Sequence, residues 1–285
     1  MKPIKKISIV TSTSLSRISE DIFSRTKKLV EGEKVKIEHV GSLNSVKKHT
    51  IKKKISKSDL ILVIGGDGTM IGSIRNLYEF SIPFLGVNIG RVGFLTDIDP
   101  KNLSMLSSVL KGGYTTEKRP IYQAFSSERK EDIFINEVVI HSGSITKMID
   151  IELSSSAKSF YRLKADGIIL SSSTGSTAYS YSGGGPIIHP EVNALSLLPM
   201  FSHSSSSHSL VLPDKDKYKV KIINHTNLNP NIVLDGSSNL KYNKRGVEIS
   251  NTKKPFYLCH PKDYNYIEAC RTKLGWALPI ENFKI

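Results

Sequence analysis

The chain has 285 residues and a formal net charge of +14, from 40 Lys and Arg against 26 Asp and Glu. Its 39% hydrophobic and 23% charged residues are typical of a soluble globular protein, and no apolar run approaches the ~20 residues of a membrane span. The two cysteines, Cys259 and Cys270, are too few and too far apart for a zinc site or a disulfide framework. The first ten residues lack the apolar core of a signal peptide, so we expect a cytoplasmic protein with no membrane partner.

The excess of positive charge does not by itself predict a nucleic-acid partner. Lysines cluster between residues 47 and 57, but no aromatic residues are interleaved with them, and the other lysines are spread along the chain. We interpret the charge as a solvated surface that also attracts polyanionic substrates, and we expect no nucleic-acid binding.

Residues 1–118 alternate between short apolar segments and segments with helical periodicity. The strand-like segments are residues 7–10, 35–40, 60–64 and 83–87, and the helix-like segments are residues 18–30, 70–80 and 103–110. Such β/α alternation predicts a doubly wound, mostly parallel sheet. Ligands of such a sheet bind at the carboxyl ends of its strands, where two glycine-rich turns of this chain fall.

The segment 60–71, LILVIGGDGTMI, is the most informative stretch of this first part. Its apolar run predicts a strand buried on both faces, followed by a glycine turn and a helix. That arrangement aims backbone N–H groups at a phosphate, and glycine permits a positive φ and a close approach of the ligand. The turn fits neither a Walker A loop, which needs a Lys-Ser/Thr pair, nor the GxGxxG dinucleotide fingerprint.

Asp67 lies at the centre of this turn, where a carboxylate repels the phosphate that the N–H groups attract. It suits a proton acceptor for a hydroxyl that lies beside the phosphates. The alternative is structural, namely a glycine turn in which Asp67 caps the following helix.

Beyond residue 118 the segments become short and β-rich, with Ser/Gly turns between them. This pattern predicts an all-β domain over residues 119–266. Residues 266–276 have helical spacing, and we expect this C-terminal helix to pack back on the first domain, so that segment 267–285 joins residues 1–118. The predicted fold class is therefore α/β plus all-β, with an N-terminal doubly wound parallel-sheet domain followed by an all-β domain.

Further segments carry polar residues that suit a nucleotide. A second glycine loop, NIGRVGFL, occupies residues 88–95. Asn136 and Glu137 form an amide–carboxylate pair within an apolar strand, where buried polar groups need partners such as ribose hydroxyls. Residues 164–167 are Lys-Ala-Asp-Gly, and residues 174–186, TGSTAYSYSGGGP, offer hydroxyls and two tyrosines that suit a purine.

In combination these motifs resemble the ATP- or polyphosphate-dependent NAD kinases of bacterial type, over nearly the whole chain. GGDGT alone is shared with diacylglycerol, sphingosine and phosphofructo-kinase relatives, whereas TGSTAYSxSxGGP is far more restrictive. Further segments that resemble the family are residues 189–204 (HPEVNALSLLPMFSHS), Asp235-Gly236 and residues 273–279 (KLGWALP).

The resemblance implies a reaction and a set of residues. Asp67 matches the general base that deprotonates the adenosine 2′-hydroxyl of NAD⁺, which then attacks the γ-phosphorus of ATP to give NADP⁺ and ADP. Gly65, Gly66 and Thr69 match the phosphate loop. The residues implied in NAD binding are Asp67, Gly68, Asn136, Glu137, Lys147, Lys164, Asp166, Thr177, Ala178, Tyr179, Ser180, Tyr181 and Ser182.

The resemblance also implies partners. Mg²⁺ or another divalent cation is expected to arrive with ATP, since the chain shows no dedicated set of protein metal ligands. Relatives form homodimers or homotetramers through the all-β domain, so we expect a homo-oligomer. The choice between ATP and polyphosphate as donor, and between NAD⁺ and NADH as acceptor, stays open.

The chain departs from the family pattern at a few positions. Ser172-Ser173 stands where relatives usually have Thr-Pro, and residues 201–209 lack a Pro, Leu, Arg and Pro that are common there. Lys164 replaces an Arg, which keeps the charge but not the bidentate fork, and Ser237 replaces a Gln. Two alternatives remain: a lipid kinase that shares GGDGT, and a catalytically silent dinucleotide-binding protein.

Overall fold

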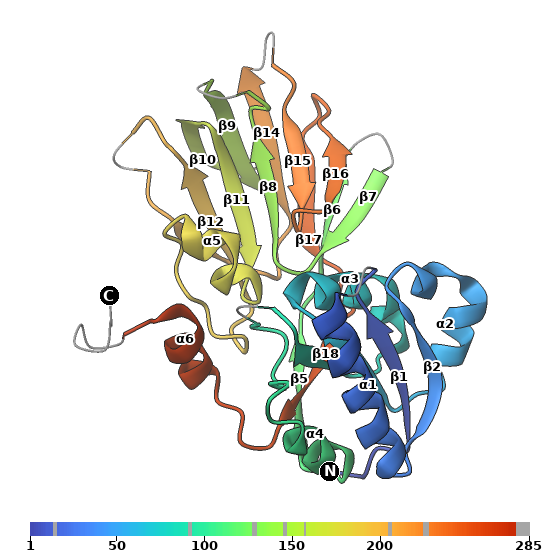
Figure 1. Ribbon diagram of the computed structural model, residues 1–285. Helices are drawn as coiled ribbons and strands as arrows, with labels where there is room; N and C mark the ends of the chain where they lie inside the picture. Colours follow the sequence, from blue (N-terminus) through green and yellow to red (C-terminus); the bar gives the residue numbers. More distant parts are fainter. Residues whose placement is uncertain are drawn as a thin grey trace. The chain divides into compact units, whose positions relative to one another are not determined.

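Figure 1 shows a computed structural model of the chain, which describes residues 1–13, 16–90, 93–126, 130–144, 147–156, 158–204, 207–224 and 228–277. Parts of the motifs quoted above lie outside the described residues, namely Arg91, Val92, Ser205, Ser206, Leu278 and Pro279. The chain divides into two compact units. Residues 1–118 and 256–285 form the first unit, and residues 119–255 form the second.

The first unit is built on a six-stranded sheet with the strand order β2-β1-β3-β4-β18-β5. Its strands are β1 (Lys6–Thr11), β2 (Lys36–Ser42), β3 (Leu60–Gly65), β4 (Phe84–Asn88), β5 (Tyr114–Arg119) and β18 (Phe256–Pro261). The pairs β1–β2, β1–β3, β3–β4 and β4–β18 are parallel. An order that runs outward from β1 in both directions is that of a doubly wound sheet, which confirms the predicted fold of this unit.

The first unit also contains helices, some of which pack apolar side chains against this sheet. They are α1 (Arg17–Gly32), α2 (His49–Ile55), α3 (Asp67–Leu77), α4 (Ser104–Leu110) and α6 (Tyr266–Leu274), with the 3-10 turns η1 (Ser45–Lys47) and η2 (Tyr78–Phe80). All six residues of β3 are buried, as its continuous apolar run predicts. Ile22 and Val30 of α1 share a buried cluster with Leu62 of β3. Among the described residues, no helix is both long and apolar enough to cross a membrane.

The position of β18 differs from our expectation. We assigned residues 256–259 to the all-β domain, which was expected to reach residue 266. Instead Leu258 pairs with Phe84 of β4, in the parallel sheet of the first unit, and the second unit ends at Pro255. Phe256, Leu258 and Cys259 are buried there. A short apolar run has the same periodicity in either kind of sheet, so the sequence could not assign the strand to the right unit.

The second unit consists of two six-stranded antiparallel sheets, with the strand orders β10-β9-β14-β17-β6-β7 and β13-β12-β11-β8-β15-β16. The strands are β6 (Tyr122–Ser126), β7 (Lys130–Phe134), β8 (Glu137–His141), β9 (Ile149–Ser155), β10 (Lys158–Ala165), β11 (Gly167–Ser172), β12 (Ala194–Met200), β13 (Leu210–Pro213), β14 (Tyr218–Asn224), β15 (Asn231–Leu234), β16 (Ser238–Lys241) and β17 (Val247–Asn251). Between β11 and β12 lie η3 (Gly175–Thr177) and the short helix α5 (Tyr179–Ser182).

One buried cluster joins the two sheets of the second unit. The rings of Tyr122 and Phe134 stack in it, with centroids 5.5 Å apart. Ile140 of β8 and Leu170 of β11 enter the same cluster from the other sheet. Inward and outward residues alternate along β9, as a strand with one covered face requires. The predicted all-β architecture is confirmed for this unit.

Candidate active site

The carboxyl ends of β3 and β4 bring the two glycine-rich loops together. Gly65, the last residue of β3, pairs with Asn88, the last residue of β4, and the Ile89 N–H donates to the Gly65 carbonyl at 3.2 Å. The Oδ1 atom of Asn88 accepts the N–H of Gly90 at 2.8 Å, which turns the chain after β4. Both turns therefore lie at the edge of the sheet where the sequence pattern predicted a ligand.

The need for glycine in the GGDGT turn is steric. A Cβ atom on Gly65 would lie 2.6 Å from both Cβ and Oγ1 of Thr69. Glycine permits a positive φ in this turn, but Gly66 has a φ of −93°, and neither Gly65 nor Gly68 lies in the left-handed region. The backbone of the turn is thus ordinary, and the absence of a side chain at Gly65 lets α3 start directly after β3.

Asp67 is the first residue of α3, and its carboxylate does not cap that helix. Gly66 is the N-cap residue, so the structural alternative for Asp67 is wrong in that form. The two carboxylate oxygens instead accept the N–H groups of Phe94 at 2.8 Å and Leu95 at 2.9 Å. Burial raises the pKa of the Asp67 carboxyl above its ordinary value, although the two N–H donors and the Lys273 ammonium act in the opposite direction.

A polar cavity of about 630 Å³ lies next to these loops in the first unit. Charged side chains of both signs line it, namely Asp21, Arg25, Asp97, Asp99, Lys101 and Lys273, together with residues of the loop after β4. Of these charged residues, only Lys273 belongs to a motif quoted from the sequence, and no role was assigned to it there. One of them, Lys273, also contacts Gly93 and Asp97, which flank the two N–H donors to Asp67.

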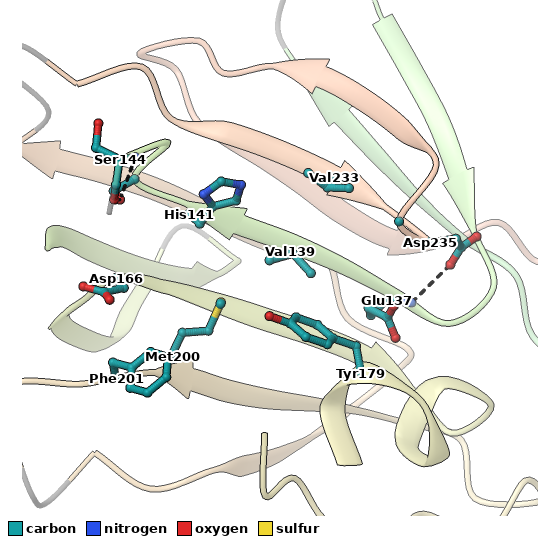
Figure 2. Close-up of a pocket in the computed structure, with 12 residues that line it drawn as sticks. Glu137, Val139, His141, Ser144, Asp166, Tyr179, Met200, Phe201, Val233 and Asp235 are labelled. Carbon is teal, nitrogen blue, oxygen red and sulfur yellow. Dashed lines mark hydrogen bonds between the residues drawn. The ribbon is translucent and has the colours of Figure 1, made fainter. Parts of the chain in front are cut away.

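A second cavity, also of about 630 Å³, lies in the second unit along β8 (Figure 2). Figure 2 shows Glu137 and Asp235 at one end of it and Asp166 with Phe201 at the other. Strand pairing agrees with this view, because β11 runs antiparallel to β8 and follows Asp166. From Glu137 to His141, the last residue of β8, the strand rises about 13 Å, which gives the approximate length of the cavity.

Glu137 is a buried acid at one end of this cavity. Its side chain is 6% exposed, and its Oε2 atom has no hydrogen-bond partner among the described residues. Burial raises the pKa of the Glu137 carboxyl to about 8, and the charge of Asp235 adds to the effect, while the backbone N–H of Tyr179 lowers it in part. The cavity therefore contains a buried acid oxygen with unused capacity for a hydrogen bond.

Asp235 fixes the backbone that carries Asn136 and Glu137. Its carboxylate accepts the N–H groups of Ile135 at 3.0 Å, Asn136 at 2.8 Å and Glu137 at 3.2 Å (Figure 2). Asp235 and Gly236 both have positive φ, 47° and 61°, in the tight hairpin between β15 and β16. The hairpin thus directs one carboxylate at three successive backbone donors.

The TGSTAYS segment packs directly on the Asn136 backbone. A Cβ atom on Gly175 would lie 2.5 Å from the Asn136 carbonyl carbon and 2.6 Å from its Cα, so only glycine fits there. The Ser172 hydroxyl donates to the Ile135 carbonyl at 2.5 Å and accepts the Gly175 N–H at 3.0 Å. These contacts bring the Tyr179 N–H to the Glu137 carboxylate. The Asn136-Glu137 pair and the TGSTAYS segment therefore form one local structure, although 36 residues separate them in the sequence.

The structure brings only some of the candidate residues together. Glu137, Asp166 and Tyr179 line the cavity in the second unit, with the Tyr179 side chain 50% exposed. Asn136 and the rest of the segment 177–182 adjoin these residues without lining the cavity, and Ser180 is buried against Ser196. Lys147 and Lys164 are exposed and do not line it. Asp67 and the phosphate-loop residues Gly65, Gly66 and Thr69, with Gly68, belong to the first unit.

Sequence reasoning missed other residues that line the second cavity, namely His141, Met200, Phe201 and Val233. In the sequence, the spacing of His141 from the other histidines matches no metal site. Phe201 is 80% exposed and has a positive φ of 47°, which is unusual for an aromatic residue. Neither the exposure of Phe201 nor its positive φ can be predicted from a single sequence.

The residues that the structure describes contain no group of three or more His, Cys, Asp or Glu side chains that could hold a metal ion. Each unit therefore has its own candidate groups, which are hydrogen-bonding and charged side chains. One unit presents a carboxylate at a glycine-rich turn, and the other presents a cavity with a buried acid and an aromatic side chain.

Two family models match the chain in succession. The ATP-NAD kinase N-terminal domain matches residues 5–114, and the ATP-NAD kinase C-terminal domain matches residues 135–260. Among curated proteins, an NAD kinase of Marinobacter nauticus is 42% identical over 229 residues, which cover 78% of each chain. An NAD kinase of Saccharophagus degradans is 39% identical over 242 residues, 82% of this chain and 81% of that protein.

Solved structures agree at the level of the fold. An NAD kinase from Archaeoglobus fulgidus in complex with ATP superposes with a TM-score of 0.75 at 22% identity, covering 95% of this chain and 97% of that one. Yeast NADH kinase complexed with NADH gives a TM-score of 0.80 at 19% identity, covering 97% and 89%. The family models, the curated relatives and the motifs agree, and the chain belongs to the NAD kinase family.

Proposed function

We propose that this chain transfers the γ-phosphoryl group of ATP to the adenosine 2′-hydroxyl of NAD⁺, giving NADP⁺ and ADP. The new bond joins the 2′-oxygen to the γ-phosphorus, and the bond from that phosphorus to the β-γ bridging oxygen breaks. The proton of the hydroxyl goes to Asp67. Mg²⁺ or another divalent cation enters as part of the Mg-ATP substrate, where it neutralises charge on the phosphates.

The role of Asp67 as general base is supported by its environment. Each of its oxygens accepts one backbone N–H and keeps a second lone pair for a substrate hydroxyl. Its pKa is raised by burial, so its affinity for a proton exceeds that of an ordinary aspartate. A positioned base of this kind typically accelerates proton transfer about 10²–10⁴-fold.

The single observation that carries the dinucleotide assignment is the unpartnered Oε2 of Glu137 in a cavity of about 630 Å³. A ribose offers hydroxyl donors at the spacing of neighbouring carbons, and a buried carboxylate that lacks a donor binds such a group favourably. The exposed ring of Tyr179 on the same cavity offers a stacking surface for a purine or a nicotinamide. We therefore assign Asn136, Glu137, Asp166 and the segment 177–182 to NAD binding.

Lys147 and Lys164 are assigned to the dinucleotide on the family resemblance. Both are exposed, as a side chain that reaches for a phosphate from the rim of a site would be. Gly65, Gly66 and Thr69 are assigned to the phosphates because α3 begins there, and Gly68 is assigned with Asp67 to NAD on the family resemblance. We also propose, on the resemblance, a homodimer or homotetramer in the cytoplasm.

The proposal is tested by incubating the purified protein with NAD⁺ and Mg-ATP, and separately with NAD⁺ and polyphosphate. NADP⁺ is detected through an NADP-specific dehydrogenase. Formation of NADP⁺ with either donor supports the proposal and identifies the donor. Diacylglycerol in vesicles with Mg-ATP tests the lipid-kinase alternative. Binding of NAD⁺ without turnover would instead support the silent dinucleotide-binding protein.

A further inference from the structure

The segment that binds Asp67 is itself held on β4. The N–H of Ile98 donates to the Gly86 carbonyl at 3.0 Å, and the N–H of Asn88 donates to the Ile98 carbonyl at 2.9 Å. A Cβ atom on Gly86 would lie 2.7 Å from the Cα of Thr96, so the returning chain packs tightly against the strand. The N–H groups of Phe94 and Leu95 therefore reach Asp67 from a segment with a fixed anchor at its far end.

The near end of this segment is held by Lys273 of α6. The Lys273 ammonium donates to the Gly93 carbonyl, lies 3.8 Å from Oδ1 of Asp97, and lies 5.6 Å from the centroid of the Phe94 ring. Its side chain is 24% exposed, so these contacts take place in a partly desolvated position. One lysine thus contacts the residues on both sides of the two N–H donors.

The Asp97 carboxylate is fixed in turn by His260 of β18. The Nδ1 atom of His260 lies 2.5 Å from Oδ2 of Asp97, and its Nε2 atom lies 3.0 Å from Oε2 of Glu117. The ring is 3% exposed and stacks on Tyr264, with centroids 3.9 Å apart. A ring that faces carboxylates on both nitrogens donates to both only as the imidazolium.

We propose that Lys273 is a positioning residue for Asp67, and that His260 supports it by orienting Asp97. This inference rests on the proposed role of Asp67 as the base. All of the residues belong to one unit of the structure, residues 1–118 with 256–285. The C-terminal segment therefore sets both the position of the segment 93–97 and the electric field at the proposed base.

The charges of this network act on Asp67 with opposite signs. The Lys273 ammonium stabilises the ionised form of Asp67 and lowers its pKa, whereas the Asp97 carboxylate destabilises that form and raises the pKa. These two are the charged groups that face Asp67 from α6 and from the segment after β4. Removing either charge should therefore move the titration of Asp67, and the two removals should move it in opposite directions.

The experiment measures kcat against pH for full-length variants, with NAD⁺ and Mg-ATP both saturating so that substrate binding does not contribute. Lys273→Met should move the acid limb of the profile to higher pH by roughly half a unit or more, and Asp97→Asn should move it to lower pH. Lys273→Met should also lower kcat about 10-fold or more, because the N–H donors lose their anchor. The KM for NAD⁺ should change less than kcat, since of the residues assigned to NAD only Asp67 and Gly68 lie in the same unit as Lys273.

Two control variants separate positioning from general damage. Lys273→Arg keeps the charge and should restore the acid limb to the wild-type pH. Arg271→Met removes an exposed charge from the same helix and should leave the profile unchanged. If Lys273→Met does not fold, Asp97→Asn alone tests the inference, because the acid limb of its kcat–pH profile should move to lower pH. Unshifted limbs in an active wild type and its variants would overturn the inference, whereas absence of NADP⁺ from the wild type would overturn the proposed function instead.

Discussion

The carboxylate of Asp67 accepts the backbone N–H of Leu95 at 2.9 Å, across 28 residues of sequence. Its other oxygen accepts the N–H of Phe94 at 2.8 Å. The GGDGT turn after β3 and the loop after β4 are therefore tied together through the side chain that we assign as the base. The same contacts orient the carboxylate, and burial keeps the pKa of Asp67 above its ordinary value.

Glu137→Gln is expected to change the pH dependence of NAD⁺ binding. In the free protein burial raises the pKa of Glu137 to about 8, and hydroxyl donors of the ligand favour the ionised form. The wild-type KM for NAD⁺ should therefore fall as pH rises towards that value. In Glu137→Gln this fall should disappear and the KM should be about 10-fold higher or more at alkaline pH. Parallel KM–pH curves for both proteins would contradict the assignment.

The same substitution is expected to stabilise the free protein at alkaline pH. Because the folded-state pKa of Glu137 is raised to about 8, the folded state binds more protons than the unfolded state between the ordinary value of 4.5 and 8. Stability is therefore lost as pH rises through this range. Glu137→Gln should exceed the wild type by about 1–3 kcal/mol in the free energy of unfolding above that pKa, and by less below 4.5. Denaturant unfolding at two pH values measures the difference.

Asp235→Ala is expected to raise the KM for NAD⁺ more than it lowers kcat. The substitution removes the acceptor of three backbone N–H groups, those of residues 135, 136 and 137, and so frees the strand that carries the NAD-binding pair. We expect a loss of about 10–100-fold in kcat/KM for NAD⁺. Asp216→Ala, at a partly exposed residue between β13 and β14 that lies outside both cavities, is a suitable control, and an equal effect of the two variants would count against the role of Asp235.

Gly175→Ala is expected to destabilise the protein by about 1–3 kcal/mol, because the added methyl group meets the backbone of Asn136. Gly32→Ala is the matched control, since nothing lies within 4 Å of its added Cβ. The control should be neutral or slightly stabilising, as Ala is a better helix former than Gly. Thermal unfolding of the two variants measures this difference. Equal unfolding temperatures would show that Asn136 and Gly175 are not in close contact.

Ser173→Ala is expected to stabilise the protein by about 1 kcal/mol. The Ser173 side chain is 1% exposed, and its Oγ atom has no hydrogen-bond partner among the described residues. The neighbouring substitution Ser172→Ala should instead destabilise by about 1–3 kcal/mol, because that hydroxyl bonds to Ile135 and Gly175. Chemical denaturation of both variants tests the pair. Changes of the same sign would contradict this account.

The sequence predicted the first unit well where the signal was local. The run 60–64 is apolar at every position, as is typical of a central strand in a sheet covered on both faces, and β3 is fully buried. For β18 the same kind of run was not sufficient. The assignment of β18 depends on the pairing of Leu258 with Phe84. These residues are 174 positions apart, and no pattern within a short stretch of sequence predicts such a pairing.

The candidate site divides in the same way. Asp67 was identifiable because a carboxylate inside a glycine turn is chemically conspicuous, but its bonds to Phe94 and Leu95 depend on how two strands pair. The coupling of Glu137 to Asp235 joins residues 98 positions apart, so the perturbed pKa of Glu137 could not be predicted. Lys273 was visible only as one letter of a C-terminal motif, without any indication of its contacts.

The most direct test of the account compares the wild type with Asp67→Asn in the NADP⁺ assay with Mg-ATP. The isosteric amide cannot accept the proton of the 2′-hydroxyl, and thermal unfolding shows whether the variant is folded. We expect NADP⁺ from the wild type and a rate at least ~10²-fold lower from the folded variant. Similar rates from both proteins would retain the kinase and contradict Asp67 as its base, and no NADP⁺ from a folded wild type would contradict the kinase itself.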